Sequence, residues 1–63
     1  GPKKKLSEKE MKEAGHYKRL GDEAFVAGKY KDALDAYTKS LKTDEWNAKV
    51  WANMSACNAK LKD

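Results

Sequence analysis

The stretch that decides the fold runs from residue 20 to residue 41, Leu20-Gly-Asp-Glu-Ala-Phe-Val-Ala-Gly-Lys-Tyr-Lys-Asp-Ala-Leu-Asp-Ala-Tyr-Thr-Lys-Ser-Leu41. Its second half has apolar side chains at the three- and four-residue spacing of an amphipathic helix, namely Tyr30, Ala33, Leu34, Tyr37 and Leu41. Small or apolar residues share one face of the preceding helix in the same way, namely Tyr17, Leu20, Gly21, Ala24 and Phe25. Two short amphipathic helices with a glycine between them form an antiparallel hairpin, because so short a connection allows no other arrangement.

The flanking residues predict where the first helix of this hairpin begins and ends. Ser7 and Glu10 have the Ser-x-x-Glu spacing of a capping box, which places a helix start near residue 7. Gly28 stands where a left-handed backbone conformation would terminate the helix.

A third helix is expected after a break at residues 43–47, where either Asp44 or Asn47 can act as its N-cap. No segment has a competing strand pattern. The sequence therefore predicts an all-α fold, an antiparallel helical hairpin plus a third helix. The expected helices span about 7–27, 29–42 and 47–61.

Length and composition limit the chain to one small domain, expected over residues 7–63. The chain has 63 residues, of which 40% are hydrophobic and 38% are charged, with one proline. This composition favours helices with solvated outer faces. A core of this size yields only roughly 3–5 kcal/mol, so we expect marginal stability or support from a partner.

The net charge of +4 is concentrated at the N-terminus, where Lys3, Lys4 and Lys5 supply three of the four charges. The first two residues, Gly-Pro without an initiator Met, resemble the scar of a protease cleavage. We expect residues 1–6 to be such a scar followed by a disordered basic tail. A tail of three lysines is weak support for contact with nucleic acid or a membrane surface, and we expect neither partner.

Residue types that carry catalysis or bind metals are sparse. Cys57 has no second cysteine to pair with, and no signal peptide or long apolar run is visible, which favours a cytoplasmic or nuclear location. His16 is the only histidine and lies in no pattern of a metal site or catalytic triad. We therefore expect no enzyme activity, no catalytic residue, no metal and no cofactor.

A repeat emerges when the chain is aligned with itself, because Ala14-x-x-Tyr17 recurs as Ala48-x-x-Trp51 after 34 residues. Residues 14–47 carry aromatic, leucine, small and glycine residues at a set of characteristic positions, namely Tyr17, Leu20, Gly21, Ala24, Gly28, Tyr30, Ala33, Tyr37 and Ser40. In this pattern the segment resembles the tetratricopeptide repeat (TPR) family, with Ser40 in place of the usual Ala and Glu45 where Pro is common. The resemblance implies about one and a half repeats, and with them a non-enzymatic protein–protein interaction module.

The resemblance also implies a concave groove lined by the first and third helices. The chain is most similar to TPRs of chaperone cofactors, including the Hsp-organising protein and TPR-containing J-domain proteins, whose carboxylate clamp holds the acidic C-terminal tails of heat-shock chaperones. Lys18 and Asn53 match two donors of that clamp, whereas Asp22 departs from the pattern, which has Asn there. Heat-shock chaperone tails are therefore candidate partners for an incomplete clamp. Further positions that map to the groove are Phe25, Val26, Lys49, Ala52, Ala56, Ala59 and Lys60.

Two interpretations of Lys18 and Asp22 remain open at this point. They can belong to a peptide site, or they can form an ordinary surface ion pair one turn apart, worth a few tenths of a kcal/mol. The alternative function is structural, because the third helix is expected to leave apolar residues without cover and to drive homodimer or helix-swapped assembly. The residues of this self-association face are Val50, Met54, Cys57 and Leu61.

The aromatic residues are interpreted mainly as core. This applies to Tyr17, Tyr30, Tyr37 and Trp51, and not to a base-stacking surface. Trp46 lies at a turn and can either anchor the corner or take part in surface recognition.

Overall fold

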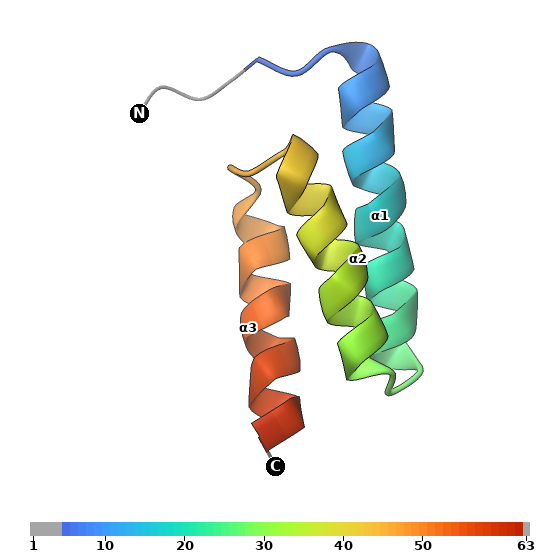
Figure 1. The fold of residues 1–63 in the computed structure, drawn as a ribbon, viewed down its shortest axis with the longest axis vertical. Helices are drawn as coiled ribbons and strands as arrows, with labels where there is room; N and C mark the ends of the chain where they lie inside the picture. The colour runs from blue at the N-terminus through green and yellow to red at the C-terminus, as the bar shows by residue number, and fades with distance from the viewer. Residues whose placement is uncertain (1–4, 63) are drawn as a thin grey trace.

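The computed structural model describes residues 5–62 and consists there of three α-helices joined by short turns (Figure 1). α1 spans Glu8–Val26, α2 spans Tyr30–Thr43 and α3 spans Ala48–Lys62. The expected all-α hairpin plus a third helix is thereby confirmed. The prediction of a scar and disordered tail falls mostly on residues 1–4, outside the described residues, whereas Leu6 is half-buried and lines a pocket with residues 42–46.

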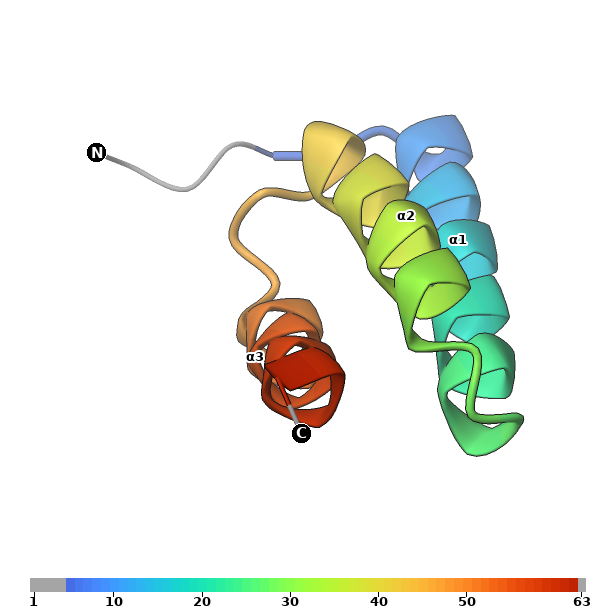
Figure 2. The same cartoon turned by 60° about the horizontal axis from the view of Figure 1, so that its bottom comes forward.

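α2 is the central helix and packs against both of its neighbours. Seen toward the helix ends, α1 and α3 lie on opposite sides of α2 (Figure 2). This arrangement leaves α1 and α3 facing one another across one side of the molecule.

The first helix begins and ends through local hydrogen bonds that the sequence predicted. The Glu10 backbone N–H donates to Ser7 Oγ at 3.1 Å, and the Ser7 backbone N–H donates to Glu10 Oε1 at 3.0 Å, which completes the capping box. At the other end, Gly28 has φ = 80°. The Lys29 N–H donates to the Ala24 carbonyl at 2.8 Å, so the helix ends in a Schellman motif.

The N-terminus of α3 is capped by Asn47, one of the two candidates. Asn47 Oδ1 accepts hydrogen bonds from the backbone N–H groups of Lys49 and Val50, at 3.1 and 3.3 Å. These two donors would otherwise lack a partner within the helix.

The buried core lies between α2 and α3, and partly buried side chains of α1 pack against it. It contains residues that are almost fully removed from solvent, namely Ala33, Tyr37, Leu41, Val50 and Cys57. Two small residues let α1 approach α2 closely. Ser40 is buried and its Oγ donates to the Ala14 carbonyl at 2.8 Å, while Gly21 lies against the ring of Tyr37.

The structure corrects the expected self-association face. Val50 and Cys57 are each 0% exposed, because α3 turns this side toward α2, so neither is among the residues of this face that lack cover. Met54 is half-buried against the same core, and Leu61 is exposed. The face on which all four were placed is therefore mostly an internal packing surface.

The interpretation of the aromatic residues also needs a correction. Trp51 is 53% exposed and is not part of the core, although its Nε1 donates to the Glu45 carbonyl at 2.8 Å. Tyr37 is fully buried, whereas Tyr17 and Tyr30 are half-buried. Trp46 is also substantially exposed at its turn. Trp51 and Trp46 thus leave aromatic surface around the α2–α3 connection.

Candidate functional site

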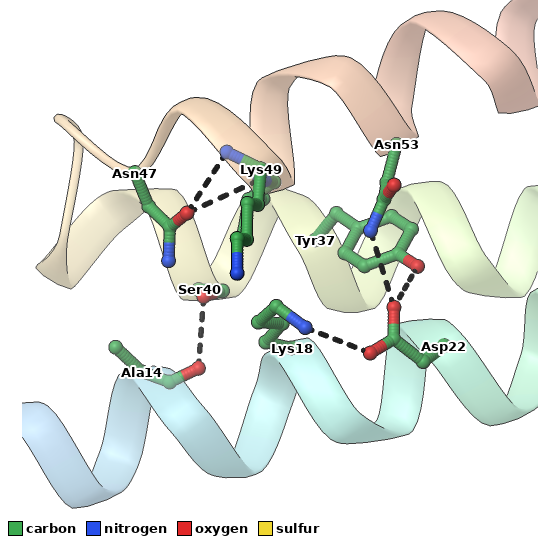
Figure 3. Close-up of polar contacts among 9 residues, drawn as sticks. Ala14, Lys18, Asp22, Tyr37, Ser40, Asn47, Lys49 and Asn53 are labelled. Atoms are coloured by element: carbon green, nitrogen blue, oxygen red, sulfur yellow. Dashed lines mark hydrogen bonds and ion pairs between the residues drawn. The ribbon is translucent and has the colours of Figure 1, made fainter.

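Four polar side chains from all three helices meet at one point in the groove between α1 and α3 (Figure 3). Lys18 and Asp22 lie one turn apart on α1, Tyr37 comes from the middle of α2, and Asn53 comes from α3. Three of these residues were singled out from the sequence, and the structure brings those three together.

Asp22 is the acceptor for every donor in this cluster. Lys18 Nζ donates to Asp22 Oδ2 at 2.9 Å. Tyr37 Oη and Asn53 Nδ2 both donate to Asp22 Oδ1, the latter at 3.2 Å. One carboxylate thus connects the three helices.

The core positions this cluster. Gly21 has no side chain, so the Tyr37 ring can lie directly against α1 beside Asp22. The ring is buried, and a buried tyrosine hydroxyl needs a hydrogen-bond partner, which Asp22 provides. The i,i+4 spacing then places Lys18 on the same side of α1 as Asp22.

The electrostatics of the cluster favour an ionised Asp22. Burial on its own would raise the pKa of Asp22, but the hydrogen bonds from Tyr37 and Lys18, together with the positive charge of Lys18, outweigh it and lower the pKa. Burial, followed by the hydrogen bond to Asp22 and its negative charge, raises the pKa of Tyr37. At neutral pH the phenol therefore keeps the proton that it donates.

A shallow pocket of about 210 Å³ adjoins the cluster. It is lined by Asp22, Tyr37 and Asn53 and, on its apolar side, by Phe25 and Val26. Phe25 is half-buried and contacts the Tyr30 ring edge-on, with 5.3 Å between the ring centroids. Val26 is largely exposed at the rim. The pocket therefore combines one apolar wall with one polar wall.

The remaining predicted groove positions do not border this pocket. Lys49, Ala56 and Lys60 are all exposed on α3. Figure 3 shows Lys49 pointing from α3 toward α1. By helical spacing these residues share a face of α3 with Asn53, and none of them is part of the hydrogen-bonded cluster.

Tyr37 is the site residue that the sequence interpretation missed, because its helical spacing marked it only as core. Its hydroxyl was the available signal, since a phenol at a buried helix position must find a polar partner nearby.

Three other features of the described residues bear on function: metal-binding side chains, the Cys57 thiol and the apolar content of the helices. Within residues 5–62 there is no group of three or more His, Cys, Asp or Glu side chains that could hold a metal ion. Burial raises the pKa of the Cys57 thiol, so it stays protonated at neutral pH. None of the helices in this part of the chain has the length and apolar content needed to cross a bilayer.

The fold and the cluster define a small all-α helical protein in which a hairpin and a third helix enclose a groove with polar donors. Over 52 residues the chain is 36% identical to serine/threonine-protein phosphatase 5 of Arabidopsis thaliana. The aligned part covers 82% of this chain and 10% of that protein, so the chain spans about a tenth of the relative's length. No family model matches the chain, and no solved structure matches it.

Proposed function

We propose that this chain is a non-enzymatic protein-interaction module of the TPR type, with the groove between α1 and α3 as its peptide-binding surface. The repeat pattern of residues 14–47 supports the proposal, and the hairpin with a third helix is the arrangement that this pattern implies. The similarity to phosphatase 5 over 52 residues adds limited support.

The observation that carries the proposal is the pairing of an apolar wall with converging donors in one solvent-accessible groove. Phe25 and Val26 supply apolar surface, and Lys18 and Asn53 supply donors. Extended peptides are commonly held in this way, with side chains against an apolar wall and polar groups fixed by side-chain donors.

The partner class suggested by the TPR resemblance is the acidic C-terminal tail of heat-shock chaperones. In this proposal Lys18 and Asn53 are the donors that match the clamp, and because both bond to Asp22, the carboxylate of a tail reaches them only by displacing Asp22. The exposed Lys49 and Lys60 add positive charge on α3. A cytoplasmic or nuclear location belongs to the same proposal, because the single cysteine is a free, buried thiol that suits a reducing compartment.

Fluorescence anisotropy with a labelled peptide ending in Glu-Glu-Val-Asp tests this partner class. Saturable binding that is weakened by Phe25→Ala, but not by Lys31→Ala at an exposed residue that does not line the pocket, would support the groove. An absence of binding to the wild-type chain, together with an absence of binding by peptides of neutral and basic sequence, would refute peptide recognition at this surface.

Self-association is the second candidate function. The observation in its favour is exposed apolar surface on α3, where Trp51 and Leu61 are 53% and 42% exposed. This differs from the face expected from sequence, since Val50 and Cys57 are covered. Sedimentation equilibrium decides between the two functions, because a molecular mass that stays monomeric at every concentration would exclude self-association.

A further inference from the structure

The donors in the groove form a receptor for one carboxylate, and the chain itself fills that receptor. We propose that Asp22 is an intramolecular occupant of a carboxylate-binding site made by Lys18, Tyr37 and Asn53, and that it prevents the groove from accepting the carboxylate of a partner. The first part of this proposal stands on the geometry alone. The second part rests on the proposed peptide-binding function.

The geometry of a receptor is visible in how the donors converge. Lys18 Nζ is 2.9 Å from one oxygen of Asp22, and Asn53 Nδ2 is 3.2 Å from the other, which also accepts from the Tyr37 hydroxyl. An ammonium, a phenol and an amide from three helices thus bind both oxygens of a single carboxylate (Figure 3). Donors of this kind form strong bonds to an ionised acceptor.

Two of the three donors, Tyr37 and Asn53, are held in place by the core and not by Asp22. The Tyr37 ring is buried between the helices, and its position is fixed by packing against α1 at Gly21. Asn53 is a half-buried residue of α3, between the buried residues Val50 and Cys57. Because these anchors do not depend on the carboxylate, its removal should leave the donors facing an open site.

Occupancy by Asp22 also determines which partners the groove accepts. The side chain of Asp22 is 43% exposed, so its negative charge faces the groove. A second carboxylate in the same place would meet a like charge and would find Lys18 and Asn53 already engaged. The wild-type groove should therefore gain little affinity from the terminal carboxylate of a peptide, and Asp22 is the residue that sets this specificity.

Acetate is a direct probe of the empty receptor. In Asp22→Ala we expect the side-chain amide signals of Asn53, followed by NMR, to shift saturably with acetate and not with equal sodium chloride. In the wild-type chain the same signals should not respond. Asp22→Asn provides a second variant that keeps the shape of the side chain, and circular dichroism confirms that each variant is helical.

The chain offers a matched control for this experiment. Asp35 forms an ion pair with Lys39 at 3.4 Å, also one turn apart, but on an exposed surface of α2 where its side chain is 72% exposed. Asp35→Ala removes the same chemical group next to a lysine without exposing a set of converging donors. A saturable acetate response of Asp35→Ala equal to that of Asp22→Ala, or no response in either Asp22 variant, would overturn the receptor.

A pair of peptides tests the consequence for specificity. The two peptides share one sequence and differ only in a C-terminal carboxylate or amide. We expect the wild-type chain to bind the carboxylate form no more tightly than the amide form, and Asp22→Ala to prefer the carboxylate by about tenfold, the effect of gaining one charge-assisted hydrogen bond. A severalfold preference for the carboxylate in the wild-type chain, or an unchanged ratio in Asp22→Ala, would contradict the role of Asp22.

The two experiments separate this inference from the proposed function. If no peptide binds to any variant, peptide recognition fails and with it the specificity role of Asp22. The acetate titration still decides whether Lys18, Tyr37 and Asn53 form a carboxylate receptor.

Discussion

Replacing Gly21 by alanine is expected to destabilise the protein, although alanine is the better helix former. A Cβ at position 21 would lie 2.5, 2.6 and 2.9 Å from three ring atoms of Tyr37, closer than carbon atoms approach one another. The ring has little freedom to retreat, because it is 1% exposed and its hydroxyl donates to Asp22. Either α1 must move away from α2, or the ring must leave its position and lose that hydrogen bond.

The magnitude follows from two opposing effects. Overpacking of a core costs about 1–3 kcal/mol, and the rigid ring places this site in the upper part of that range. Replacing a mid-helix glycine with alanine gains about 1 kcal/mol. We therefore expect Gly21→Ala to lower the free energy of unfolding by about 1–2 kcal/mol, which for a domain of this size lowers Tm by roughly 5–15 °C.

Gly15 is the matched control, because it lies in the same helix and a Cβ there would meet nothing within 4 Å. Gly15→Ala should gain helix propensity without a clash and raise the free energy of unfolding by about 0.5–1 kcal/mol. Thermal and urea unfolding followed by far-UV circular dichroism measure both variants. If Gly21→Ala is as stable as Gly15→Ala, the close approach of α1 to Tyr37 is not a constraint and the reasoning fails.

Three further perturbations test other parts of the structure. Folding lowers the pKa of Asp22 below its ordinary value of 3.8. The ionised carboxylate therefore contributes fully to stability when the pH is above 3.8, and this contribution is lost as the pH falls through the folded-state pKa. Urea unfolding between about pH 2 and pH 6 should therefore show a steeper acid loss of stability for the wild-type chain than for Asp22→Asn, and parallel profiles would contradict this. Ser40→Ala should cost about 1 kcal/mol in urea unfolding, since it removes the hydrogen bond to Ala14, whereas no loss would mean that the bond contributes nothing net. Gly28→Ala forces a side chain into the left-handed region and should cost about 1–2 kcal/mol in the same assay, unless the α1–α2 turn rearranges.

Sequence patterns predicted the parts of the fold that depend on local chemistry. The capping box at Ser7 and the left-handed glycine at position 28 act within a single turn, so their residue types suffice to find them. The spacing of apolar residues in α2 likewise identified its buried face, including Tyr37 and Leu41.

The parts of the fold and of the site that were not predicted depend on how the helices pair, and local residue spacing does not specify that pairing. The apolar residues of α3 share one face, but their spacing does not show that α2 covers it. Val50 and Cys57 were therefore placed on a self-association face, whereas both are buried. Asp22 was recognised as a departure from the clamp pattern. Its bonds to Tyr37 and Asn53 join residues 15 and 31 positions apart, beyond the reach of helical periodicity.

The central position of α2 has a consequence for binding. The main buried cluster consists of residues of α2 and α3, and α1 reaches α3 through the hydrogen bond from Asn53 to Asp22. A fluctuation that releases α3 would leave the α1–α2 hairpin packed but would remove one side of the groove. The groove therefore exists only in the fraction of molecules whose third helix is docked, and the apparent affinity for any ligand scales with that population.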